Sequence, residues 1–330
     1  MSGVTGRPPE RGIVVMAARV LVPLFLAGAL GAGAWLAHRA RGPQRRDLDA
    51  LVTVGGDLAR DAISPALDLT RLGTAEEMEL GRRIDAEVRA GLPAAVDPAA
   101  QAYLDELLAS LSVHVSRPGI TYSVLLLRSS EVRAFSVAGG RVYLTEGLLG
   151  FVRNEAELAA VLGHEIAHID RRHCVERLQF ERAARRIDSG LASLARLGYE
   201  IMLRGFSEEQ ELAADGEGAL LAARTAYDAW RMSDLLNRIG TLDPGAIRAP
   251  TRDPIFETVV ALPEALRRYA ATHPPAPQRL EAVRRALAGR PDLWRDAPRY
   301  VGRANLEERR TKSKDPRADE WVTRRQEPDR

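Results

Sequence analysis

Two histidines four residues apart, His164 and His168, constrain this chain more than any other feature of its sequence. On a helix, which turns by about 100° per residue, their imidazoles lie on one face and can reach one ion. Glu165 follows the first histidine and lies near enough to hold a metal-bound water without taking a coordination position itself. The apolar residues around the pair, within a helical pattern from Glu155 to about Leu178, predict a buried helix that carries a metal site.

A third ligand decides whether this is a metal site, because two histidines one turn apart can also be ordinary core or surface residues. Glu211 and Asp215 lie four residues apart on a second predicted helix and can both face the first one. We expect Glu211 to be the third ligand and Asp215 to orient a ligand imidazole. The alternative is a solvated acidic helix face, which is the better interpretation for the neighbouring Glu208 and Glu209. Two histidines and one carboxylate leave a position for water, as in catalytic zinc sites.

Away from the motif, the sequence alternates between helical and extended patterns. Helices are predicted to begin at Thr74, Asp97, Glu208 and Arg279. Asp97 is the expected N-cap of its helix, with Pro98 at the first helical position. The segments Ile120 to Leu127 and Arg141 to Thr145 are rich in β-branched and apolar residues and predict strands. This mixture of helices and strands predicts an α+β protein. We expect a mostly helical domain with a small antiparallel sheet beside the helix that carries His164, Glu165 and His168, called the HExxH helix below.

Composition excludes several classes of protein. Cys174 is the only cysteine, so an internal disulfide, a multi-cysteine zinc finger and an iron–sulfur cluster are ruled out. The 47 basic and 45 acidic residues nearly cancel to a net charge of +2, which leaves no chain-wide basic field. Nucleic acid is therefore not an expected partner.

The N-terminal region contains an uncharged apolar run of 18 residues, Val20 to Ala37. As a helix it would span about 27 Å, just short of the roughly 30 Å core of a bilayer. It is therefore a short membrane anchor or, if Met16 is the true start, a secretory signal peptide. A buried core helix is the third alternative. We assign residues 1–38 to this segment and expect residues 20–37 to bind a membrane if they are not cleaved.

The charges around this run leave its orientation open. Arg39 and Arg41 directly after it favour the cytoplasmic side, whereas the order of charged, apolar and small residues favours export. We favour a membrane-associated protein that faces the periplasm or another extracytoplasmic compartment. Residues 39–73 are predicted to be a linker and residues 74–290 the folded domain. Residues 291–330 are predicted to be a disordered tail, because 15 of the 25 residues from Leu306 to Arg330 are charged.

Four blocks of this sequence resemble the zinc metallopeptidases of the HtpX and CAAX prenyl protease type, peptidase family M48. The blocks are Phe135 to Leu149, Glu155 to His168, Glu211 to Asp215, and His273-Pro274 with Arg279. The similarity runs from about Met78 to Leu287. It implies a zincin-like fold with one zinc ion per chain, bound by His164, His168 and Glu211, and with Glu165 as the catalytic base.

The resemblance also implies roles for residues outside the ligand set. The stretch Gly139-Gly140-Arg141-Val142-Tyr143 resembles the edge strand on which such enzymes bind an extended substrate. His273 and Arg279 match positions near the active site that are implicated in transition-state stabilisation or access control, although His273 is also explained as a turn residue before prolines. His173 matches a family position, but on a continuous helix it would lie about 160° from the midline of the ligand pair. We interpret it as an orienting or structural residue.

Together these patterns predict a zinc-dependent metalloendopeptidase that hydrolyses misfolded or unassembled proteins, in membrane or envelope protein quality control. Its partners would be polypeptide substrates. The alternative from another class is a chaperone or adaptor that keeps the zinc fold and binds clients with little proteolysis. A zinc hydrolase acting on a non-peptide bond is a third possibility. The natural substrate and the oligomeric state stay open, as does the role of residues 179–206, for which a surface or lid helix is one interpretation.

Overall fold

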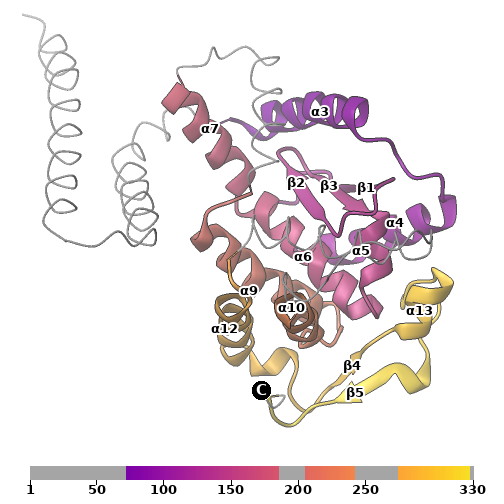
Figure 1. Ribbon diagram of the computed structural model, residues 1–330. Helices are drawn as coiled ribbons and strands as arrows, with labels where there is room; N and C mark the ends of the chain where they lie inside the picture. Colours follow the sequence, from indigo (N-terminus) through magenta and orange to yellow (C-terminus); the bar gives the residue numbers. More distant parts are fainter. Residues whose placement is uncertain (1–71, 186–204, 242–273, 328–330) are drawn as a thin grey trace, which may run out of the picture. The chain divides into compact units, whose positions relative to one another are not determined.

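The computed structural model describes residues 72–185, 205–241 and 274–327 (Figure 1). In chain order, their elements are α3 (Thr74–Gly91), α4 (Pro98–Ser112), β1 (Ser123–Leu127), β2 (Ala134–Val137), β3 (Arg141–Thr145), α5 (Glu146–Phe151), α6 (Glu155–Asp170), α7 (His173–Arg185), α9 (Glu208–Arg224), α10 (Arg231–Thr241), α12 (Ala276–Ala288), η1 (Pro291–Leu293), β4 (Pro298–Tyr300), α13 (Arg303–Glu308), η2 (Ala318–Glu320) and β5 (Trp321–Thr323). The predicted α+β domain, mostly helical with a small sheet, is confirmed.

Helix α4 begins where the sequence predicts. The Asp97 side chain accepts a hydrogen bond from the backbone N–H of Ala100 at 2.9 Å, and Pro98 occupies the first turn, where its missing N–H removes no helical hydrogen bond. Leu104 and Leu107 lie on the buried face of the helix, which packs against β1 and α6. The leucine stripe of α4 therefore forms part of the core beneath the sheet.

Within the described ranges, the main sheet has three strands in the order β1-β3-β2. β2 and β3 form an antiparallel pair, with Phe135 opposite Tyr143. β1 adds to the other side of β3 in parallel. Gly139 and Gly140 have φ values of 78° and 87°, which favour glycine, and they form the turn from β2 into β3. β2 and β3 both contact α6, so the sheet lies beside the HExxH helix.

β3 is the central strand of this sheet and not an edge strand. Arg141 to Thr145 pair with β1 on one side and with β2 on the other, so the backbone of β3 has no free edge for a peptide. The expectation that Gly139 to Tyr143 includes the edge strand is therefore wrong. The edge strand that contacts α6 is β2. Its four residues, Ala134 to Val137, are too short a run to show strand periodicity, so the sequence did not indicate it.

The helix predicted to continue to about Leu178 is divided in two. α6 ends at Asp170, and Arg172 adopts a left-handed conformation with φ of 64° before α7 begins at His173. This conformation is uncommon for residues other than glycine, and it interrupts the helical hydrogen-bond ladder. The helical pattern continues across the break, which is why the sequence predicted a single helix.

Helices α6 and α9 approach each other at two glycines. A Cβ atom added to Gly163 in α6 would lie 2.7 Å from the carbonyl oxygen of Gly218 in α9. One added to Gly218 would lie 2.6 Å from the backbone nitrogen of His164. Only glycine at both positions permits this separation. Figure 1 shows α6 between the small sheet and α9, so the crossing brings the acidic residues of α9 beside the histidines of α6.

Residues 291–327 are ordered, contrary to the expectation of a disordered tail over residues 291–330. They form η1, β4, α13, η2 and β5, with β4 and β5 paired antiparallel. Trp294 and Tyr300 are buried, at 1% and 0% exposure. The charges that suggested disorder instead form ion pairs with the rest of the domain, as Arg324 does with Asp228 at 2.8 Å. Composition alone counts such charges as solvated because it does not show their partners.

The ordered C-terminal segment contacts the start of the HExxH helix. The backbone N–H groups of Glu155 and Ala156 donate to the carbonyl oxygens of Gly302 and Val301 at 2.9 and 3.0 Å. These N–H groups belong to the first turn of α6, where no partner exists within the helix. The segment therefore supplies hydrogen-bond acceptors to the helix that carries the motif.

Several predictions fall on residues outside the described ranges. These are the apolar run at residues 20–37, Met16 as a start, the linker at residues 39–73 except for its last two residues, and His273. Most of residues 179–206 also lie outside them. Within the described ranges, no helix has the length and apolar character needed to cross a bilayer.

Candidate metal centre

Helix α6 is buried on nearly all sides, which fits its apolar sequence. The Asn154 side chain caps the helix by accepting a hydrogen bond from the backbone N–H of Glu157 at 2.9 Å. His164 and His168 lie one turn apart in the second half of the helix, at 4% and 1% exposure. Packing of the whole helix therefore fixes the backbone from which both imidazoles project.

His164, His168 and Glu211 form a group suited to a metal ion, with ligand atoms that lie within 4.8 Å of one another. The Nε2 atoms of the two histidines are 3.1 Å apart. Glu211 reaches them from α9, with carboxylate oxygens 3.5 Å from His164 Nε2 and 3.7 Å from His168 Nε2. Two ligands about 2.1 Å from a tetrahedral zinc ion would lie roughly 3.4 Å apart. The predicted ligands therefore meet at separations that fit one zinc ion.

Asp215, one turn after Glu211, contacts the far side of His164. Its Oδ1 lies 2.9 Å from His164 Nδ1. Arg279 from α12 donates to both oxygens of this carboxylate, from Nε at 2.8 Å and from Nη2 at 2.7 Å. Burial alone would raise the pKa of Asp215, but Arg279 and His164 lower it to about 2. Asp215 is therefore an ionised carboxylate beside His164 Nδ1, and His164 Nε2, which faces His168 and Glu211, is the nitrogen positioned to bind a metal.

Glu165 lies at the boundary between α6 and β2. It is 4% exposed, and burial raises the pKa of its carboxyl group above the ordinary value of 4.5. His164 and Ser136, the latter from the edge strand β2, lie near this carboxyl group and act on its pKa in the opposite direction. A carboxyl group whose pKa is raised is better suited to accept and then return a proton.

Phe206 and His173 contact His168, and neither belongs to the predicted ligand set. The ring of Phe206 stacks on the His168 imidazole, with centroids 3.9 Å apart and planes 16° apart. His173 Nδ1 lies 3.1 Å from His168 Nδ1. Burial, and then the charge of Arg171, lowers the pKa of His173 to about 4. His173 reaches His168 because the break at Arg172 turns the chain back, a geometry that a continuous helix does not allow.

Arg279 lies near the centre, and the structure adds Phe206 to the residues around it. Arg279 is 3% exposed and binds Asp215, the carboxylate beside His164, and its charge also lowers the pKa of Glu165. Phe206 was missed, although it directly precedes Ser207, whose side chain caps α9 together with Gln210. An apolar residue before such a cap commonly packs against its own helix, and this position was the available signal.

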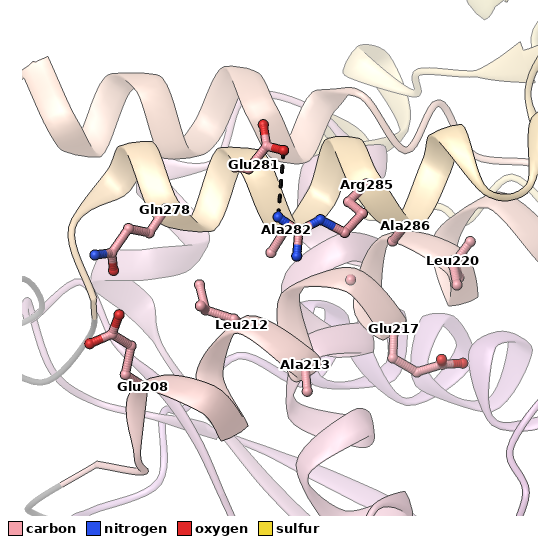
Figure 2. Close-up of a pocket in the computed structure, with 11 residues that line it drawn as sticks. Glu208, Leu212, Ala213, Glu217, Leu220, Gln278, Glu281, Ala282, Arg285 and Ala286 are labelled. Carbon is pink, nitrogen blue, oxygen red and sulfur yellow. Dashed lines mark ion pairs between the residues drawn. The ribbon is translucent and has the colours of Figure 1, made fainter. Parts of the chain in front are cut away.

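A separate groove of about 590 Å³ lies along the outer side of α9, between α9 and α12 (Figure 2). The metal ligands do not line it. Figure 2 shows Glu281 and Arg285 of α12 as an ion pair, 3.6 Å apart, above the groove. The lining residues are Glu208, Leu212, Ala213, Gly216, Glu217, Leu220, Gln278, Glu281, Ala282, Arg285 and Ala286. Helix α9 therefore presents Glu211 and Asp215 to α6 and the groove to the opposite side.

Several known proteins match part of this chain. A beta-barrel assembly-enhancing protease from Escherichia coli (strain K12) is 25% identical over 59% of this chain and 43% of its own length. The mitochondrial metalloendopeptidase OMA1 of Schizosaccharomyces pombe is 31% identical over 38% of this chain and 40% of its own. Protease HtpX of Xanthomonas campestris is 30% identical over 49% of this chain and 65% of its own. The chain thus spans less than half of the first of these relatives.

The profile of peptidase family M48 matches residues 98–287, more than half of the chain. This range contains the sheet, the HExxH helix, α9 and all but the last residue of α12. The resemblance found in the sequence is therefore confirmed over the region that holds both histidines, Glu211 and Asp215. The chain belongs to peptidase family M48.

Proposed function

We propose that this protein is a zinc-dependent metalloendopeptidase. The observation that carries the proposal is the meeting of His164, His168 and Glu211 from two helices, with Glu165 on the same helix as the histidines. Two imidazoles and one carboxylate are the ligand set of several catalytic zinc sites, in which the remaining position takes water. Membership of a peptidase family supports peptide bonds as the target.

The residues of the chain divide the proposed reaction between them. A bound zinc ion supplies Lewis acidity and lowers the pKa of a coordinated water to about 7. Glu165 accepts a proton from the water whose oxygen attacks the peptide carbonyl carbon. When the C–N bond breaks, Glu165 returns that proton to the leaving amine. Asp215 keeps the Nδ1 proton on His164 throughout, and Arg279 keeps Asp215 ionised. The proposal also keeps His273 as a residue near the active site that stabilises the transition state or controls access.

We propose β2 as the strand that aligns the substrate, in place of Gly139 to Tyr143. Among the described residues, β2 pairs only with β3, so its second edge has backbone groups available to an extended polypeptide. Ser136 of β2 lies near enough to Glu165 to lower the pKa of its carboxyl group. A peptide added along this edge would therefore run beside the proposed base.

The proposed clients are misfolded or unassembled polypeptides of a membrane or cell envelope. One relative is named for enhancing beta-barrel assembly and another for its mitochondrial location, which supports this class of substrate. An extended edge strand recognises backbone more than side chains, which suits substrates that have lost their fold. Attachment to the membrane through residues 20–37, facing the extracytoplasmic side, is part of the same proposal.

The substitution Glu165→Gln tests the proposal. It removes the base but none of the ligands, so we expect zinc stoichiometry to stay near one per chain while casein cleavage falls by about 100- to 10,000-fold. Glu209→Gln is the matched control, because Glu209 is exposed on α9, and it should cleave casein as the wild type does. Retained cleavage by Glu165→Gln would exclude the assigned base. A wild-type protein that suppresses casein aggregation without cleaving it would favour the chaperone alternative.

A further inference from the structure

The two ligand histidines are supported by different chemical groups. His164 faces the carboxylate of Asp215, whereas His168 faces a third imidazole, that of His173. His173 is 6% exposed and His168 is 1% exposed, so water has little access to the contact. The Nδ1 atoms lie 3.1 Å apart, and their rings meet at 69°. This separation and burial indicate a hydrogen bond between the two rings.

The position of the metal ligands fixes which ring donates. His168 directs Nε2 toward His164 Nε2 and Glu211, so a metal ion would bind His168 through that nitrogen. Its proton then lies on Nδ1, which donates. A hydrogen bond over 3.1 Å needs an acceptor on the other side, so His173 Nδ1 has no proton and His173 carries its proton on Nε2.

We propose that His173 is a positioning residue for the metal centre, which accepts the Nδ1 proton of His168 and so fixes its tautomer and ring orientation. This role rests on the zinc site of the proposed function. His173 would do for His168 what Asp215 does for His164, but without adding a negative charge. Phe206 complements it by stacking on the ring face, so that the edge and one face of the His168 imidazole are both held.

The break between α6 and α7 makes the contact between His173 and His168 possible. His173 is five residues after His168, a spacing that an uninterrupted helix would turn away from the ligand face. The left-handed conformation of Arg172 restarts the helix in a new direction, and His173 is the first residue after it. A strained backbone conformation that places one side chain on a site is consistent with a positioning role.

Metal binding by three variants tests the proposal with the full chain. His173→Phe keeps a ring but removes the acceptor, His173→Asn keeps an acceptor oxygen near the place of Nδ1, and His114→Phe makes the same change at an exposed histidine. Zinc dissociation constants are measured by competition with a chromophoric chelator, and the visible absorption of the cobalt-substituted protein reports the ligand geometry. Circular dichroism checks that each variant is folded.

We expect His173→Phe to bind zinc about 10- to 100-fold more weakly than the wild type and to alter the cobalt spectrum. His173→Asn should recover most of the affinity, and His114→Phe should match the wild type. Wild-type affinity in His173→Phe, or equal weakening in the Phe and Asn variants, would overturn the proposal. Neither readout requires peptide cleavage, so a protein that binds zinc and cleaves nothing would refute the endopeptidase while leaving this result intact.

A measurement on the unmodified protein covers the case in which His173→Phe does not fold. Long-range proton–nitrogen NMR spectra of the zinc-loaded wild type distinguish the two histidine tautomers. We expect the proton on Nδ1 of His168 and on Nε2 of His173. A proton on Nδ1 of His173 would contradict the assigned hydrogen bond.

Discussion

At the scale of single residues, the centre combines one charged and one neutral support for its ligands. The Asp215 carboxylate is itself fixed by two hydrogen bonds from Arg279, so three residues form a continuous chain from α12 to His164. Each member lacks access to solvent, which strengthens the interactions and makes the loss of one charge costly. Arg279 therefore acts on His164 through Asp215.

Asp215→Asn is expected to weaken both metal binding and folding. The amide removes the carboxylate charge that Arg279 faces, and breaking a buried pair in this way costs about 3–5 kcal/mol. Loss of the acceptor for His164 should also reduce zinc affinity by about 10- to 100-fold. Urea unfolding and chelator competition measure the two effects. Asp292→Asn, which breaks an exposed pair with Arg290, is the control and should change neither. Unchanged zinc affinity in Asp215→Asn would contradict the role given to this carboxylate.

Lys312 gives a prediction about pH. Burial lowers its pKa from 10.5 to about 8, although Glu155 opposes this shift. Between these two pH values the unfolded chain keeps the proton and the folded chain loses it, so the folded state gains stability as the pH rises. Urea unfolding at pH 7.5 to 10 should therefore show the free energy of unfolding of the wild type rising relative to that of Lys312→Met. A difference between the two proteins that is constant with pH would contradict the burial of this amine.

Most residues of the metal centre could be predicted from the sequence alone. The spacing of His164, Glu165 and His168 predicted a metal site. The acidic pair on α9, Glu211 and Asp215, predicted its third ligand and a residue that orients a histidine. These residues lie on regular helices, where spacing determines which side chains share a face. Phe206 and the contact of His173 depend on where helices begin and end, and local breaks are the least predictable part of a sequence pattern.

At the scale of elements, the crossing of α6 and α9 positions Glu211 beside the histidines. The sequence predicted both helices but gave no measure of how closely they pack, which depends on the meeting of Gly163 and Gly218. It also predicted β1 and β3 but not β2, because four residues give too little periodicity. The strand order depends on pairing between segments that are separated in the sequence, so no local pattern predicts it. The same holds for the edge that is available to a peptide.

Gly218→Ala tests the importance of the close crossing. The new Cβ would lie 2.6 Å from the backbone nitrogen of His164 and 2.8 Å from its Cα, so α9 must move away from α6. We expect a loss of stability of about 1–3 kcal/mol, as for overpacked cores, and weaker zinc binding because Glu211 moves with α9. Gly150→Ala in α5 is the control, since its Cβ meets nothing within 4 Å. Thermal unfolding and chelator competition report both quantities, and wild-type values in Gly218→Ala would refute the constraint.

At the scale of the whole molecule, the folded region extends beyond the match to the family. The matched range ends at residue 287, yet residues 291–327 bury Trp294 and Tyr300 and supply acceptors to the first turn of α6. Charge content predicted disorder there, because composition does not distinguish charges in water from charges paired across a fold. Local sequence patterns do not predict the contact between α6 and this segment, because the two are far apart in the chain.

A chain that stops after Arg290 is expected to unfold more easily than the full chain. Removing a single large buried aromatic side chain costs about 3–5 kcal/mol, and the truncation removes both Trp294 and Tyr300. The midpoint of thermal unfolding should therefore fall by roughly 10 °C or more. Amide hydrogen exchange at Glu155 and Ala156 should accelerate, because their acceptors are lost. A chain that stops after Arg324 keeps these contacts and is the control. Equal midpoints for the Arg290 truncation and the full chain would show that the C-terminal segment does not stabilise the helix that carries the metal ligands.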